Sequence, residues 1–193
     1  MENFIKVLKL TPKGSIYVFF LSVGLYLPDL DLALLPILHH RSIITHSILL
    51  PFLLALIIEK YLKEKLPLNY SYITSGLYAG IGIHLMADVF SPATGFGAIY
   101  FPWPMKMSIG ILTYPWLIFN GVYAFHKTQK DILENKIIFI ILIVAGALWY
   151  AIFNEKSVKP FLLFGIIYST VIFIKKYKLS KHLSLEELDT KNE

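Results

Sequence analysis

The chain has 193 residues, of which 56% are hydrophobic and only 16% are charged, and its mean hydropathy is +0.62. This composition is too apolar for a soluble domain of this size and indicates an integral membrane protein. The chain contains no cysteine, which excludes disulfides, iron–sulfur clusters and zinc sites built from thiolates.

Six apolar stretches approach the length of about 20 residues that a helix needs to cross about 30 Å of hydrocarbon. The sequence therefore predicts an all-α fold, a multi-pass transmembrane helical bundle of about six spans. It forms one domain over residues 1–178 and is followed by a polar cytoplasmic tail over residues 179–193. The six predicted spans, of which the last is short, are residues 15–38, 43–62, 72–90, 107–125, 137–153 and 161–174.

The basic residues predict the topology of this bundle. Most of the 18 Lys and Arg residues precede the first span, follow the sixth, or lie in the loops around residues 59–71 and 126–136. Because basic flanks stay in the cytoplasm, both termini are expected inside the plasma (inner) membrane. The net charge of +5 is therefore a signal of topology, and no nucleic-acid partner is expected.

Ionisable side chains interrupt the first three spans, where each costs roughly 2.5 to 3.5 kcal/mol and marks a functional site by default. In the predicted topology these side chains come late in span one, early in span two and late in span three. They therefore reach the same depth, and we expect one site near the external boundary. The residues concerned are Asp29, Asp31, His46, His84 and Asp88, with Arg41 close by.

The third span carries the clearest local geometry. His84 and Asp88 are four residues apart, which places both on one face of a helix. Gly76 and Gly80 continue the same stripe, and small residues at this spacing let membrane helices approach closely. The stripe is therefore predicted to face the bundle interior. The alternative interpretation is a packing motif with a hydrogen-bonded polar pair.

Asp29 and Asp31 would point in nearly opposite directions on a straight helix. Pro28 removes a backbone donor and favours extended geometry at Leu27, so the first span is predicted to break here. In an extended or restarted segment, both carboxylates can face one site. The alternative is that one aspartate caps the helix that restarts after the break.

The segment between the first two spans adds three histidines and an arginine. Arg41 has a rigid fork of donors that suits a phosphate or carboxylate, and its alternative role is a salt bridge to one of the aspartates. His39 and His40 precede it, and His46 follows with Thr45. By contrast, the remaining histidines lie on the predicted cytoplasmic side and are interpreted as ordinary surface residues.

The loop over residues 91–104 is rich in proline, glycine and aromatic side chains. Its place at the outer boundary predicts an interfacial aromatic belt that includes Tyr100 and Trp103. The functional alternative is a lid or re-entrant wall over the polar site.

Three motifs follow one another in the first half of the chain: Leu27-Pro28-Asp29-Leu30-Asp31, then His40-Arg41 with Thr45-His46-Ser47, then Gly80-x3-His84-x3-Asp88-x2-Ser91-Pro92-Ala93 ending in Phe101-Pro102-Trp103-Pro104. In this order they resemble the YdjM-like family of predicted membrane-bound metal-dependent hydrolases, over about residues 20–104. The chain departs from the family pattern in carrying Leu32 directly after the second aspartate, where family members often have a histidine. Its longer spacing before Thr45 leaves both His39 and His40 as counterparts of one family histidine.

That family is distantly similar to zinc-dependent phospholipases C, so the resemblance implies a metal-assisted phosphoester hydrolase. Imidazole and carboxylate ligands suit Zn²⁺, with Mn²⁺ as the alternative, and a catalytic site keeps one position open. The predicted metal ligands are His46, His84 and Asp88, joined by Asp31 and His40. The predicted catalytic residues are Asp29, Asp31 and Arg41, and the predicted substrate contacts are Arg41, His39 and Trp103.

A site at the outer leaflet would meet lipid head groups or polyprenyl phosphates, which are the predicted substrates. The main alternative from another class is a transporter or proton relay, because chains of Asp and His inside membranes also serve that task. Against this alternative, the ionisable residues gather near one face, and the sequence shows no internal repeat of the kind many transporters have. A non-catalytic scaffold with a structural metal is a third possibility.

Overall fold

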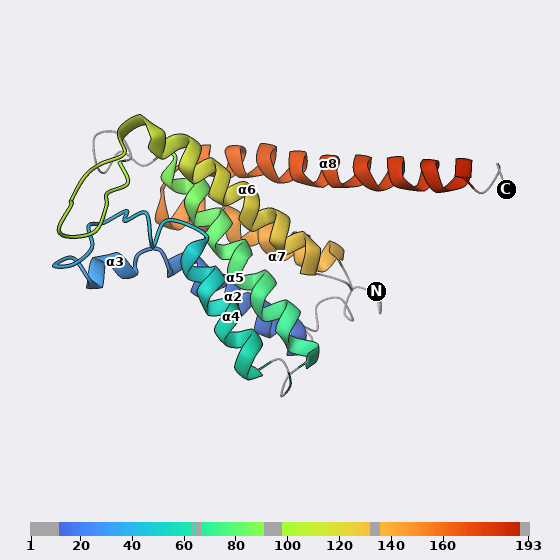
Figure 1. Cartoon of the computed structure of the whole chain (residues 1–193), viewed down its shortest axis with the longest axis horizontal. Helices are drawn as coiled ribbons and strands as arrows, with labels where there is room; N and C mark the ends of the chain where they lie inside the picture. The colour runs from blue at the N-terminus through green and yellow to red at the C-terminus, as the bar shows by residue number, and fades with distance from the viewer. Residues whose placement is uncertain (1–11, 63, 65–66, 91–97, 132–135, 190–193) are drawn as a thin grey trace.

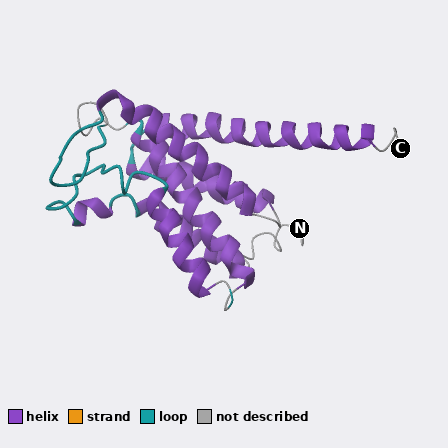
Figure 2. Ribbon diagram, in the orientation of Figure 1, coloured by secondary structure: helices purple, strands orange, loops and turns teal. Residues whose placement is uncertain are grey.

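The computed structural model describes residues 12–62, 64, 67–90, 98–131 and 136–189. Within these ranges the chain forms helices joined by irregular segments, with isolated bridges as its only β-type pairing (Figures 1 and 2). The predicted all-α class is confirmed. The helices are α2 (Pro12–Tyr26), α3 (Leu30–Ala33), α4 (Leu49–Leu62), α5 (Pro67–Asp88), the 3₁₀ turn η1 (Gly110–Leu112), α6 (Thr113–Asp131), α7 (Lys136–Trp149), the π turn η2 (Tyr150–Asn154) and α8 (Lys159–Asp189).

Helix α5 lies at the centre of the bundle and packs most extensively against α2 and α6. Its contact with α2 is backbone against backbone: a Cβ atom at Gly80 would collide with the carbonyl oxygen of Leu21, and one at Gly24 with that of Leu77. Small residues permit this close approach, which supplies van der Waals contact where lipid offers no hydrophobic driving force. The prediction that the Gly76–Gly80 stripe faces the bundle interior is confirmed.

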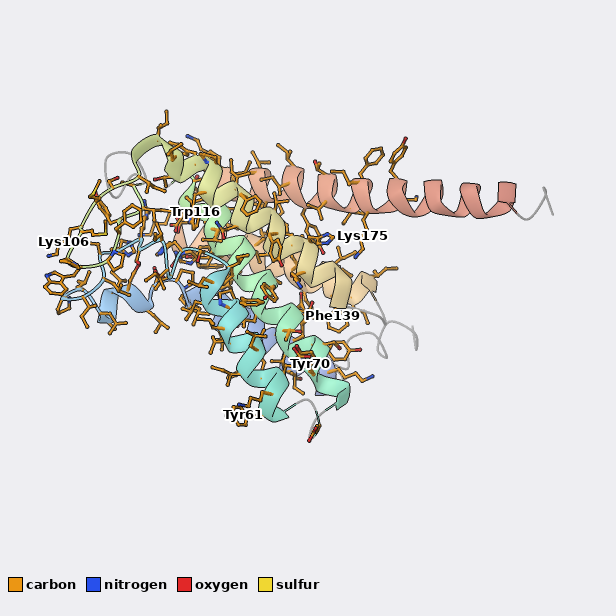
Figure 3. All side chains as sticks on the ribbon, in the orientation of Figure 1. Tyr61, Tyr70, Lys106, Trp116, Phe139 and Lys175 are labelled. Atoms are coloured by element: carbon orange, nitrogen blue, oxygen red, sulfur yellow. The ribbon has the colours of Figure 1, made fainter. Side chains whose placement is uncertain are left out.

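The irregular segments gather at one end of the bundle, with α3 beside them (Figure 2). Figure 3 shows Lys106 at this loop end, whereas Tyr61 and Tyr70 lie at the opposite end of α4 and α5. At the loop end, Tyr100 forms isolated bridges with both Ser42 and Ser108, and we call this arrangement the clip around Tyr100.

The predicted break at Pro28 is confirmed, since α2 ends at Tyr26 and α3 begins at Leu30. The predicted start of the second helical span was wrong: α4 begins at Leu49, several residues after the expected start at residue 43. The Thr45 hydroxyl accounts for the later start, because it bonds the backbone oxygen of Ser42, close by in sequence, and the side chain of Asp31 on α3. Hydroxyl side chains that bond nearby backbone in this way compete with helix formation.

Two described helical stretches, Ile137–Asn154 and Lys159–Tyr177, are long and apolar enough to cross a membrane. Helix α2 is apolar but has 15 residues and α4 has 14, so at 1.5 Å per residue each covers only about 20–23 Å. The break at Pro28 and the irregular segment before α4 shorten the first two predicted spans. The bundle of six spans therefore stays a prediction.

Helix α8 has 31 residues, and only its first part packs against the bundle before it projects away (Figure 1). It runs to Asp189, so the predicted tail begins as a continuation of this helix, and residues 190–193 lie outside the described residues.

Candidate metal centre

Three separate elements bring the polar residues together at the loop end. Asp31 lies on the short helix α3, His46 lies in the irregular segment before α4, and His84 and Asp88 occupy the last turns of α5. All four side chains are buried, with at most 7% of each residue exposed. The predicted convergence of these residues, which are up to 57 positions apart in the numbering, is confirmed by the distances that follow.

Two histidines and one aspartate converge on a single point. His46 Nε2 lies 3.1 Å from Asp88 Oδ2, and His84 Nε2 lies 3.3 Å from the same oxygen. All three atoms are buried, yet none completes a hydrogen bond within the described part of the chain. Ligand atoms bound tetrahedrally at about 2.0–2.1 Å from Zn²⁺ lie about 3.3 Å from one another, which matches this spacing.

His84 is oriented through its other ring nitrogen. Its Nδ1 lies 2.7 Å from the carbonyl oxygen of Leu25 and 2.8 Å from the hydroxyl of Tyr150. Because a carbonyl oxygen only accepts, Nδ1 carries a hydrogen, and in the metal-binding form of the ring the lone pair of Nε2 points towards Asp88. A cation between these two acceptors satisfies both, and a backbone carbonyl behind a histidine is a common support for a metal ligand.

His46 has a carboxylate in the equivalent place. Its Nδ1 lies 3.0 Å from Thr45 Oγ1 and 3.3 Å from Asp31 Oδ2, and the Thr45 hydroxyl donates to Asp31 Oδ2 at 2.9 Å. A carboxylate behind a ligating histidine fixes the ring orientation and raises the basicity of the ligand. This geometry favours an orienting role for Asp31, on the side of His46 away from the convergence point.

Asp31 also holds the surrounding segment. The backbone N–H of Ser42 donates to Asp31 Oδ2 at 3.1 Å, and His40 Nδ1 lies 3.1 Å from Asp31 Oδ1. Asp31, His40 and His46 therefore form a second group with metal-ligand geometry, which shares His46 with the first. An imidazole whose Nδ1 carries a hydrogen offers only Nε2 to a metal, so the first group is the better candidate for holding a metal ion.

Arg41 contacts the same aspartate that the histidines face. Its guanidinium nitrogen donates to Asp88 Oδ1 at 3.4 Å, and the residue is only 2% exposed. Its φ of 65° is left-handed, a conformation that non-glycine residues hold only when the surrounding structure compensates for the strain. The arginine therefore keeps a buried positive charge beside the convergence point, as expected for an anion-binding role or for the predicted salt bridge.

Asp29 marks the open side of the site. Its Oδ1 lies 3.9 Å from His84 Nε2, and its side chain is 31% exposed. It occupies the N-cap position of α3 without making a capping hydrogen bond, so the capping alternative receives no support from its side chain. With His46 and His84 it forms a group that could hold a metal ion.

The remaining predicted residues lie further from the convergence point. The ring of His39 packs on Tyr100 at a centroid distance of 5.6 Å, which distinguishes it from His40. Trp103 is 63% exposed, and its backbone N–H donates to Ile37. Residues 91–97, including the Ser91-Pro92-Ala93 part of the third motif, lie outside the described residues.

Sequence reasoning missed two supports of the site. Tyr150 contacts His84 from the π turn η2, and Trp116 Nε1 donates to the backbone oxygen of His46 at 3.1 Å. Neither is close to the motifs in sequence. The only signal was chemical, since each carries a polar atom at one end of an apolar ring within an apolar stretch.

The fold and the site define an all-helical protein whose buried histidines and aspartates could hold a metal ion. The chain matches the YdjM inner membrane protein family over residues 4–173 and belongs to this family. It is therefore a member of a membrane protein family, as its composition predicted. No curated protein and no solved structure matches the chain, so the expected similarity to zinc-dependent phospholipase C stays a prediction.

Proposed function

We propose that the protein is a membrane-embedded, metal-dependent hydrolase that cleaves a phosphoester of a lipid or lipid-linked substrate. One observation carries this proposal: His46 Nε2, His84 Nε2 and Asp88 Oδ2 converge without hydrogen bonds of their own in the described structure. Three protein ligands with one open position are the arrangement of catalytic zinc sites, whereas structural sites are closed by four ligands.

Zn²⁺, or Mn²⁺ as the alternative, supplies Lewis acidity when bound, which polarises a phosphoryl oxygen and activates water. His46, His84 and Asp88 would hold the ion. Asp29 is the most open carboxylate of the group, and its place beside His84 suits it to accept a proton from the attacking water. Arg41 neutralises the charge that develops on the phosphoryl oxygens.

The less buried residues complete the proposed substrate site. His40 is about one-third exposed and lies beside Asp31, where it can contact a ligand that enters from the loop end. His39 and Trp103 are proposed to contact the head group or its lipid surroundings. The clip around Tyr100 then covers the site and limits the entry of bulk water.

We further propose that both termini are cytoplasmic and that the site opens to the outer leaflet. The asymmetry of basic residues supports this orientation. The loop end also exposes large apolar side chains, which suit the boundary between head groups and hydrocarbon: Leu35, Ile37, Trp103 and Met105 are each at least half exposed. A reporter that works only in the cytoplasm should be active when it is fused after Glu193. Activity of a reporter that works only outside the cell would contradict this topology.

The test of the function is release of phosphate or a phosphorylated head group from a panel of lipids, with and without a chelator. Asp88→Ala and His46→Ala should each abolish turnover while the protein remains inserted in the membrane. His126→Ala, on the exposed surface of α6, should behave as wild type. Release that a chelator does not reduce would contradict the metal mechanism.

A proton relay is the second candidate, because one observation favours it. The ionisable side chains form a continuous series from His40 through Asp31, His46 and Asp88 to His84. The series ends against an apolar core between α2 and α7, which includes Leu21, Ile143 and Ala147. Proton or ion flux that is lost in Asp88→Ala, with no hydrolysis of any lipid, would favour this candidate.

A further inference from the structure

An apolar groove of about 500 Å³ lies beside the metal centre, between the start of α4 and α6. Ile44, Ile48 and Phe52 line one side, and Trp116, Phe119 and Tyr123 line the other. Its volume falls within the range of about 300–1,000 Å³ that is typical of small-molecule sites. The metal centre has no residue in this lining, so the groove is a separate site.

The groove and the metal centre share one wall. In the segment before α4, Thr45 and His46 face the polar cluster, whereas Ile44 and Ser47 line the groove. Several polar atoms near the groove are already hydrogen-bonded within the protein: Trp116 Nε1 donates to the oxygen of His46, and the N–H of Ile48 donates to Asn120 Oδ1. What the groove offers a ligand is therefore almost entirely apolar surface, one residue away from a metal ligand.

The rim of the groove decides what kind of ligand fits. Leu49 is 45% exposed, Phe52 is 42% exposed and Phe119 is 66% exposed, so the rim is apolar as well. Interfaces between proteins have a polar, hydrated rim around an apolar centre. Here the few polar lining side chains include Ser47 and Asn120, which bond the backbone oxygens of Ile44 and Trp116. In a chain of an inner-membrane family, an apolar groove with an apolar rim fits the hydrocarbon chain of a lipid.

We propose that this groove binds one hydrocarbon chain of a membrane phospholipid and that this lipid is the substrate whose head group reaches the metal centre. The second half of this statement rests on the proposed function, whereas binding of the chain does not. The His46–Ser47 peptide unit joins the two sites, so a lipid in the groove lies against the segment that carries a metal ligand. The groove therefore assigns the substrate class: a phosphoester that carries at least one long hydrocarbon chain.

Lipid retention tests the binding directly. The protein is incorporated into vesicles of phosphatidylethanolamine and phosphatidylglycerol, exchanged into lipid-free detergent, and its bound lipid is extracted and identified by mass spectrometry. Wild type should retain about one phospholipid per chain, because such sites are few in each protein. Ile44→Trp should reduce retention about tenfold or more, the loss produced when two methylene groups are kept out of an apolar site. Ile166→Trp, at an exposed position of α8, should retain as much lipid as wild type.

A second pair of variants keeps the test valid if Ile44→Trp fails to fold. Phe119→Asp places a charge on the groove rim, and Phe173→Asp places the same charge at a position on α8 with matching exposure, 69% against 66%. Only Phe119→Asp should lose the lipid. Equal retention in the two variants, no lipid on wild type, or a second copy of the chain cross-linked at position 119 would each overturn the proposal.

The two proposals fail in different ways. His84→Ala should still retain the lipid, because it removes a metal ligand and leaves the groove intact. Retained lipid without any hydrolysis supports the groove and contradicts the proposed function. Hydrolysis that is equally fast for short and long chains, and unchanged in Ile44→Trp, contradicts the groove as a substrate site and leaves the hydrolase standing.

Discussion

The α2–α5 interface and the polar cluster at its end are built on opposite principles. Gly24, Gly76 and Gly80 bring the two helix backbones into direct contact, so this interface depends on close packing. In the cluster, hydrogen bonds hold the irregular segment that carries His46. Asp31 is their main acceptor, because His40, the Ser42 N–H and the Thr45 hydroxyl all contact its carboxylate. We therefore expect added side-chain volume to disrupt the α2–α5 interface, and the loss of polar atoms to weaken the cluster.

The two regions are nevertheless linked in one direction. His84 is oriented by the carbonyl oxygen of Leu25, which lies on α2, so the cluster depends on the close approach of the helices. The interface itself rests on the glycine contacts, to which the cluster adds the bond to Leu25. We therefore expect changes at the glycines to abolish both fold and metal binding, and changes in the cluster to abolish metal binding alone.

The largest expected effect is at Gly80. Gly80→Leu places a Cβ atom against the carbonyl oxygen of Leu21, and close packing leaves no room for relaxation, so folded protein should be lost. Gly165→Leu is the matched control, because a Cβ atom there meets nothing within 4 Å. The yield of monodisperse protein in size-exclusion chromatography measures the effect. Equal yields for the two variants would show that the glycine contacts are dispensable.

Removal of a metal ligand should have the next largest effect. His84→Ala and Asp88→Ala should each lower metal affinity by more than about 100-fold, beyond the 10–100-fold loss that supporting residues produce. Elution volume and helix content should stay close to wild-type values, because the glycine contacts between α2 and α5 remain in both variants, although His84→Ala also loses the bond to the Leu25 carbonyl oxygen. Metal titration of the purified variants checks this expectation, with His126→Ala as the control. Loss of the folded state in both variants would contradict the proposed independence of fold and site.

A smaller effect is expected when the support of His46 is weakened. Thr45→Val removes the hydroxyl that lies between Asp31 and His46 and should lower metal affinity about 10–100-fold. Thr170→Val removes a hydroxyl that donates to the backbone oxygen of Ile166 at an exposed position of α8, and it should leave affinity unchanged. If Thr45→Val matches the control, Asp31 does not orient His46 in the way the distances indicate.

The smallest effect is expected at Tyr150. Tyr150→Phe removes one of two contacts to His84 Nδ1, and the Leu25 carbonyl oxygen remains. The loss of one hydrogen bond corresponds to a reduction in metal affinity of about threefold to tenfold. Tyr177→Phe, at a 64% exposed position, should cause no reduction. If Tyr150→Phe lowered the metal affinity as much as His84→Ala does, the expected small effect would be wrong and Tyr150 would be a principal determinant of metal binding.

Sequence patterns predicted the parts of the molecule that depend on local chemistry. Pro28 predicted the break after α2, and the spacing of Gly76, Gly80, His84 and Asp88 predicted which face of α5 turns inward. The convergence of the polar residues followed from charge asymmetry and chain direction, without any knowledge of packing. These features require only the geometry of one helix or the position of a residue along a span.

Features that depend on contacts between distant segments could not be predicted. The start of α4 depends on the bond from Thr45 to Asp31, which forms only when α3 folds back beside the segment. The different positions of Asp29 and Asp31 are set in the same way, because one faces the open side and the other lies behind His46. Tyr150 reaches His84 from the far half of the chain, 66 positions away, and its own sequence neighbourhood is apolar.

The divalent-metal content of the purified protein tests the central claim most directly. The protein is loaded with Zn²⁺, desalted, and analysed for zinc beside His84→Ala and the His126→Ala control. The account predicts about one equivalent for wild type and for His126→Ala, and nearly none for His84→Ala, because the three converging atoms form a single centre. Less than about a tenth of an equivalent on wild type, or an undiminished amount on His84→Ala, would contradict it.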